Sequence, residues 1–243
     1  MSKTFTNIPI FDPASKIVSA NNTFANVPDT TGAGSTVAPL LINTLMGVSS
    51  TYSALAGSTL TNTGNSGVYG DLGVSSGTSV TGFPPGIVFN GSIHSNDASA
   101  IQGQVDLTSA YNYAVAQTGA IDLTGQNLGG LTLAPGVYKY TSTAQLTGIL
   151  TLDGGNNPNA QWIFQIGSTL TTAASSFVGM IKGGVPGNVI WQVGTSATLG
   201  ASTAFMGNIL ANASITLTTS SSVDGRLFAR TGAITLDTNV IRG

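Results

Sequence analysis

The chain has 243 residues with 41% hydrophobic content, which is enough to bury a substantial core in one large domain. Charged residues make up only 7%, against about 25% in an ordinary soluble domain, and all nine acidic residues are aspartates. With a net charge of -2 and no cluster of lysines or arginines, the chain has no positively charged surface to attract nucleic acid or anionic lipid. We therefore expect neither nucleic acid nor a membrane as a partner.

Cysteine is absent, so disulfides and thiolate metal sites are excluded. No apolar run approaches the roughly 18 residues of a membrane span, and the start, MSKTFTNIPIFDPASK, has no apolar h-region of a secretory signal. The stretch VAPLLINTLMGV at 37–48 is interrupted by Pro39 and Asn43, which favours buried structure. We divide the chain into an N-terminal extension, residues 1–47, and a folded domain, residues 48–243.

Similar short segments recur from residue 53 onward. SALAG at 53 and DLGVS at 71 are 18 residues apart, and STLT at 58 precedes TSVT at 78. Each pair is typical of strands at equivalent positions in successive turns of a repeat.

Residues 97–117, DASAIQGQVDLTSAYNYAVAQ, are predicted to form a helix that Asp97 caps. Its apolar residues fall on one broad stripe at 3.6 residues per turn, and Gly103 weakens the pattern. The stripe consists of Ile101, Val105, Leu107, Tyr111, Ala114 and Val115.

The C-terminal part repeats most clearly. IWQV, NILA and RLFA begin at 190, 208 and 226, and ATL, ITL and ITL follow at 197, 215 and 234. WIFQI at 162 with STLTT at 168 adds a further turn, and VYKYT at 137 is a candidate start of another. Three short strands in about 18 residues predict a triangular parallel β-solenoid of about six turns, all-β except for the helix.

Strict alternation in the second segments places Ile215 and Leu217 on one face of a strand and Thr216 and Thr218 on the other. Stacked turns then place hydroxyl residues in two columns on a flat, almost uncharged face. The first column comprises Thr59, Ser79, Thr169, Thr198, Thr216 and Thr235, and the second comprises Thr61, Thr81, Thr171, Thr218 and the outlier Asp237.

Two readings of this face stay open. Threonine suits any exposed strand, but the scarcity of lysine and the regular array favour contact with a repetitive solid such as ice. A second candidate face is formed by the small, hydroxyl-rich third segments TAASS at 172, GASTA at 200 and TTSSS at 218. We prefer the threonine columns.

Several stretches closely resemble the large microbial ice-binding protein family of fungi, diatoms and bacteria: LAGSTLTNTGNSGVYGDLGVSSGTSVTGFPPG (55–86), LTLAPGVYKYTSTAQLTGILTLDG (131–154) and GRLFARTGAITLDTNVI (225–241). The resemblance covers about residues 50–243. It implies a right-handed, irregular solenoid whose N-terminal turn lies beside the last ones, with one long helix along a side face. It also implies an extracellular location and an ice-binding face, although the family has no single ice motif to transfer.

Catalytic chemistry is not indicated. Sugar hydrolysis needs paired carboxylates, whereas the aspartates occur singly, and the one histidine, His94, lies in a polar stretch expected to be a loop. Trp162 and Trp191 are expected in the core or against the helix. We expect no cofactor and no metal.

The sequence thus predicts a non-enzymatic, monomeric ice-binding protein with thermal hysteresis and inhibition of ice recrystallisation. The alternative is a structural or adhesive β-solenoid without activity toward ice.

Overall fold

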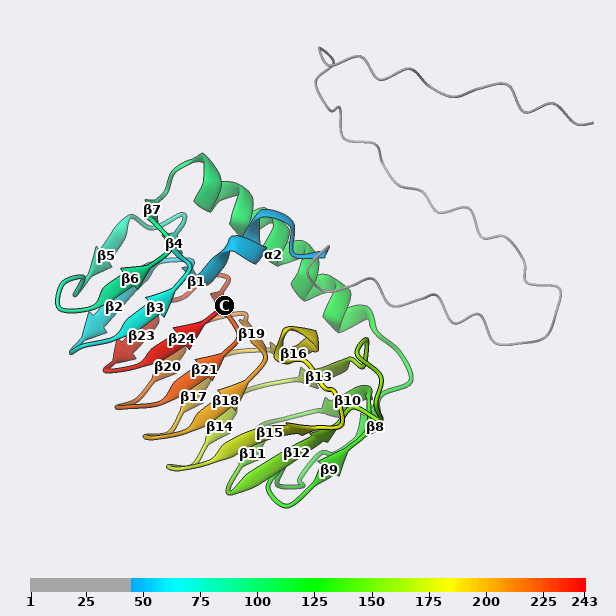
Figure 1. Ribbon diagram of the computed structural model, residues 1–243. Coiled ribbons are helices and arrows are strands. Elements are labelled where there is room, and N and C mark those ends of the chain that lie inside the picture. Colours follow the sequence, from blue (N-terminus) through cyan, green and yellow to red (C-terminus); the bar gives the residue numbers. More distant parts are fainter. Residues whose placement is uncertain (1–44) are drawn as a thin grey trace, which may run out of the picture. The chain divides into compact units, whose positions relative to one another are not determined.

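Short strands separated by glycine- and serine-rich corners wind into a three-sided coil in residues 45–243, the part of the chain that this computed structural model describes (Figure 1). The extension predicted over residues 1–47 lies almost wholly outside these residues. Every strand pair among them is parallel, as a solenoid requires, and the three sides are three parallel sheets, A, B and C.

Sheet A has nine strands, and most of their residues are buried on both faces because the solenoid interior lies on one side and a helix on the other. Apolar residues accordingly occupy both faces of the segments at 190, 208 and 226. In spatial order the strands are β7 (Ile93–Ser95), β4 (Asp71–Val74), β1 (Tyr52–Ala56), β22 (Leu227–Ala229), β19 (Asn208–Ala211), β16 (Val189–Val193), β13 (Trp162–Ile166), β10 (Gly136–Tyr140) and β8 (Ile121–Asp122).

Sheet B has seven strands that alternate between buried and accessible residues, so one of its faces is open. In spatial order they are β11 (Ala144–Leu146), β14 (Leu170–Thr172), β17 (Ala197–Leu199), β20 (Ile215–Leu217), β23 (Ile234–Asp237), β2 (Thr59–Thr63) and β5 (Ser79–Thr81).

Sheet C has eight strands, and the helix does not cover it in Figure 1. In spatial order they are β6 (Ile87–Phe89), β3 (Gly67–Tyr69), β24 (Val240–Arg242), β21 (Ser222–Asp224), β18 (Ala204–Met206), β15 (Phe177–Ile181), β12 (Ile149–Asp153) and β9 (Thr132–Leu133). Two short 3-10 helices, η1 (Gly47–Thr51) and η2 (Pro186–Asn188), complete the described elements besides the α-helix.

The turns do not stack in chain order. The C-terminal turn, β22 to β24, pairs on one side with β19 to β21 and on the other with β1 to β3, so red and cyan strands are neighbours in Figure 1. This confirms the order that the family resemblance implies. The 18-residue period holds between Ile190 and Asn208, but the partners Ile163 and Ile190 are 27 residues apart because inserts lengthen the corners.

The helix α2 (Ala98–Ala116) lies along sheet A, and Asp97 caps it by accepting a hydrogen bond from the amide of Ala100 at 2.9 Å. The predicted stripe is only half right, because Ile101, Val105 and Val115 are 49%, 55% and 51% exposed. Leu107, Tyr111 and Ala114 of the stripe are buried, and the small residues Ala100, Gly103 and Ala110 complete the buried side of α2.

The solenoid interior is filled by aliphatic side chains and a row of aromatic rings. Phe164 stacks on Trp191 with centroids 3.9 Å apart and planes inclined by 6°, and Tyr138 and Phe205 continue the row on either side. Trp162 and Trp191 are fully buried, as predicted, and their indole nitrogens donate to backbone carbonyls. Such flat stacking holds successive turns parallel.

Candidate functional site

The outer face of sheet B carries all ten hydroxyl residues singled out from the sequence. Eight of them lie within its strands, and Thr169 and Thr218 directly flank β14 and β20. Each is accessible to solvent, whereas the residues between them point inward and are buried, apart from the half-buried Val80. These ten residues are Thr59, Thr61, Ser79, Thr81, Thr169, Thr171, Thr198, Thr216, Thr218 and Thr235.

One unbroken column runs along the middle of this face. Each residue is the register partner of the next in the neighbouring strand. We call it the central column: Gln145, Thr171, Thr198, Thr216, Thr235, Thr61 and Thr81. Parallel rungs lie about 4.8 Å apart, so six threonines repeat at nearly constant spacing.

The predicted composition of the columns was wrong. Aligning the segments by their first threonine placed Thr59 beside Thr235, but the register places Thr61 there because buried Leu60 pairs with buried Ile234. The residues two positions before those of the central column form a second row on the same face. This row contains Thr169 and also Thr59, which is paired with Ser79. Ser196, Ser214 and Ala233 continue that row, although the threonine pattern did not indicate them.

A third row lies two residues beyond the central column. Thr63 is paired with Asp237, and Thr218 belongs to the same edge of the sheet. The hydroxyl of Thr218 donates to the carbonyl of Leu199 at 2.8 Å, and that of Thr63 donates to Leu236 at 3.3 Å. These two hydroxyls therefore already have hydrogen-bond partners within the protein.

The hydroxyls of the six central threonines make no hydrogen bond to any described residue, so they are available to whatever lies on the face. The strands of sheet B contain one charged side chain, Asp237, at the edge of the face. Beneath the threonines, in every strand of this column except β5, the inward aliphatic residues are at most about 1% exposed: Leu60, Leu170, Ala197, Leu199, Ile215, Leu217, Ile234 and Leu236. A fully packed backing of this kind resists deformation of the face.

The outer face of sheet C is less uniform. Its outward side chains include Ile149, Phe177 and Ile87, which are 58%, 39% and 54% exposed, and the charged residues Asp224 and Arg242, which are register partners. The third segments predicted as a second candidate face lie at the corner between sheets B and C. Ser175, Ser202 and Ser220 occupy that corner with φ of 57°, 56° and 62°.

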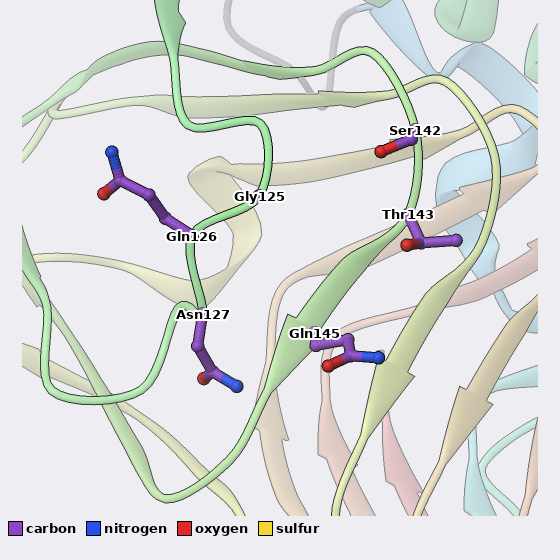
Figure 2. Close-up of a pocket in the computed structure, with 6 residues that line it drawn as sticks. All are labelled: Gly125, Gln126, Asn127, Ser142, Thr143 and Gln145. Atoms are coloured by element: carbon purple, nitrogen blue, oxygen red, sulfur yellow. The ribbon is translucent and has the colours of Figure 1, made fainter.

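At the β11 end of sheet B, the outer face ends beside a polar hollow of about 230 Å³ (Figure 2). Asn127 forms an isolated parallel bridge with Gln145, so the central column ends in two amides. The Asn127 Oδ1 atom accepts from the amides of Gly129 and Thr147 at 2.8 and 3.0 Å, which fixes the loop. The hollow thus belongs to the end turn that terminates the face.

His94 lies in strand β7, although the sequence predicted a loop. Its Nδ1 atom is 2.7 Å from the carboxylate of Asp97, and its Nε2 atom is 3.9 Å from that of Asp71. The imidazole therefore ties the start of α2 to strands β7 and β4. Within residues 45–243, no group of three His, Cys, Asp or Glu side chains is arranged to hold a metal ion. No helix in this range is both long and apolar enough to span a membrane.

These features define a class: a parallel β-solenoid with a companion helix and one face that carries threonines in register. The model of the family described as ice-binding-like matches residues 54–242. The chain therefore belongs to the ice-binding-like family.

Individual relatives agree with this membership. The chain is 56% identical over 198 residues to the "Ice-binding protein" of Nostoc sp. (strain HG1), covering 81% of this chain and 73% of the relative. It is 31% identical to the "Ice-binding protein" of Flammulina populicola, and the match covers 81% of this chain and 87% of the relative. Among solved structures, the ice-binding protein of Antarctomyces psychrotrophicus has a TM-score of 0.78 at 40% identity, covering 81% of this chain and 96% of that one.

Proposed function

We propose that this chain adsorbs to ice through the outer face of sheet B, and that adsorption produces thermal hysteresis and inhibits ice recrystallisation. The observation that carries the proposal is the central column, six threonines in register with unengaged hydroxyls on a face with one edge charge. Membership of the ice-binding-like family supports ice as the ligand.

The mechanism follows from the chemistry of threonine on a rigid sheet. Methyl groups at fixed spacing order the adjacent water, and the hydroxyls beside them join that water to the ice lattice. Because the strands are already fixed by hydrogen bonds to both neighbours, little conformational entropy is lost on adsorption. Adsorbed molecules make the ice front curve between them, and a curved front grows only at a lower temperature.

The preference for sheet B over sheet C rests on uniformity. A face that carries Phe177, Asp224 and Arg242 presents side chains of different length and charge, whereas the sheet B face presents threonine on six successive rungs. From family membership we also infer that the protein acts outside the cell. We infer that it acts as a monomer, since one face is sufficient for adsorption.

The direct test observes single ice crystals in dilute solutions of the full chain. We expect faceted crystals and a gap between the melting and freezing temperatures that grows with protein concentration. Polycrystalline ice held below its melting point should also keep small grains. Crystals that grow undisturbed and without facets would contradict the proposal and favour a purely structural solenoid.

A further inference from the structure

The second row of the sheet B face runs beside the central column from β14 to β5. Each of its residues stands two positions before a threonine of the central column, and alternation places the two on the same side of the strand. In spatial order the row contains Thr169, Ser196, Ser214, Ala233, Thr59 and Ser79.

Two serine hydroxyls in the middle of this row are held by backbone amides. The amide of Ser214 donates to the Oγ atom of Ser196 at 3.2 Å, and the amide of Ala233 donates to the Oγ atom of Ser214 at 3.2 Å. Each bond joins one rung to the next, so each oxygen is fixed relative to two rungs. The hydroxyls of the central threonines have no such partner in residues 45–243.

These amide contacts also determine where the serine hydroxyl hydrogens point. A hydroxyl has one donor hydrogen and two acceptor lone pairs. At Ser196 and Ser214 one lone pair faces an amide hydrogen, and the hydroxyl hydrogen has no acceptor among the described residues. Both side chains are half-buried on the outer face. They therefore present a donor and a remaining lone pair to whatever covers this face.

The spacing of the two serine oxygens suits a bridging water molecule. Equivalent atoms on neighbouring rungs lie about 4.8 Å apart, and a hydrogen bond between a hydroxyl and water is about 2.8 Å long, so a water bonded to both oxygens has an angle of about 120° between its two bonds. Water in ice forms its four bonds at a similar, tetrahedral angle. A water in this position keeps its other two bonds for the ice lattice.

We propose that Ser196 and Ser214 are ice-binding residues, which hold first-layer water at fixed positions beside Thr198 and Thr216. This inference rests on the proposed function of the sheet B face. The hydroxyls of the central threonines rotate to suit the water above them, whereas the serine oxygens are positioned by the sheet before ice arrives. Groups that are already fixed lose little entropy on binding.

Ala233 is the gap in this row. It lies between Ser214 and Thr59, on the rung of Thr235, and it is the one residue of the six without a hydroxyl. Its side chain is half-buried on the same face. A serine at position 233 would join the hydroxyls on both sides into one uninterrupted row.

The test compares Ser196→Ala, Ser214→Ala and the double variant with Ser66→Ala in the full chain. The Ser66 hydroxyl also accepts from a backbone amide, that of Asn239 at 2.9 Å, but Ser66 is buried at the corner before β3. At temperatures where circular dichroism shows every variant folded, we expect a severalfold loss of thermal hysteresis in the double variant, smaller losses in the single variants and none in Ser66→Ala.

Two further measurements address the row directly. Ala233→Ser should raise the hysteresis above that of the native chain, because it fills the gap. A high-resolution crystal structure of the native chain should show an ordered water bonded to both serine hydroxyls, and the structure of the double variant should lack it. A native structure without this water, or no gain in Ala233→Ser, would contradict the proposal.

The outcomes separate this inference from the function on which it rests. Thr216→Tyr, made alongside, tests the face itself. Unchanged hysteresis in the double serine variant, with activity lost in Thr216→Tyr, would overturn the role of Ser196 and Ser214 and leave the face in place. Equal losses in the double variant and Ser66→Ala would also overturn it, because general stability would then explain both. Full activity in Thr216→Tyr would remove the face.

Discussion

At the scale of single residues, the carboxylate of Asp97 is held by two partners at the start of α2. The amide of Ala100 donates to Oδ1 at 2.9 Å, and the His94 Nδ1 atom lies 2.7 Å from Oδ2. The hydrogen bond from Ala100, followed by that from His94, holds the pKa of Asp97 below the ordinary aspartate value of 3.8. The charged form is therefore favoured in the folded state.

Because the folded pKa is lowered, this stabilisation is present above about pH 4 and is lost as pH falls through the folded value. We expect the melting temperature of the native chain to fall on acidification below that point. Asp97→Asn should lose part of this dependence while keeping a capping oxygen. Thermal unfolding followed by circular dichroism at several pH values measures both, and identical acid dependence in the two proteins would contradict the assignment.

Residue-level prediction from sequence succeeded where a local signal exists and failed where the signal is nonlocal. The Asp97 cap was predicted because capping depends on the next three residues. The threonine columns were predicted on the right face but in the wrong rows. Alternation alone does not say whether Thr59 or Thr61 lies beside Thr235, and only pairing of Leu60 with Ile234 decides it.

At the scale of elements, α2 packs on sheet A through small residues as well as through Leu107 and Tyr111, and the small residues let it lie close to the sheet. A Cβ added at Gly103 would lie 3.0 Å from a methyl group of Leu55 and 3.3 Å from the ring of Tyr52, tighter than an ordinary contact. The hydrophobic pattern favoured the larger Ile101 and Val105, which the structure leaves exposed. A prediction that favours large apolar residues therefore misses small residues such as Gly103, which let the helix approach the sheet closely.

The helix should contribute stability and not contact with ice. Leu107 is fully buried between α2 and sheet A, so Leu107→Ala should lower the free energy of unfolding by about 2–5 kcal/mol. The control Val105→Ala, at an exposed position, should change it by less than about 0.5 kcal/mol. Urea titration gives both values. Near 0 °C both variants should keep full thermal hysteresis, and a loss confined to Leu107→Ala while folded would assign α2 a direct part in activity.

At the scale of the whole molecule, the sequence predicts the solenoid but not its complete course. The 18-residue period revealed about six turns, whereas sheet C contains eight strands, because long corners such as that between β15 and β16 disguise the larger turns. The insertion of the N-terminal turns beside the last turn came from family resemblance alone. Periodicity cannot supply it, since the pairing of β2 with β23 has no counterpart in chain order.

A matched pair of bulky substitutions distinguishes sheet B from sheet C as the face that meets ice. Thr216 lies at the middle of the central column, and Ser222 lies at an equally accessible outward position of sheet C. Ser222 is the better control than Ser202, whose φ of 56° strains a tyrosine. Thr198→Tyr provides a second position on the face, one rung from Thr216.

The measurement is thermal hysteresis of folded Thr216→Tyr, Thr198→Tyr and Ser222→Tyr at equal concentration, with melting temperatures recorded for each. We expect the two sheet B variants to lose most of the gap between melting and freezing, because a phenol ring lifts the face off the ice. Ser222→Tyr should keep the native gap. The opposite result, full activity in both threonine variants and its loss in Ser222→Tyr, would contradict ice binding by sheet B and assign the ice-binding face to sheet C.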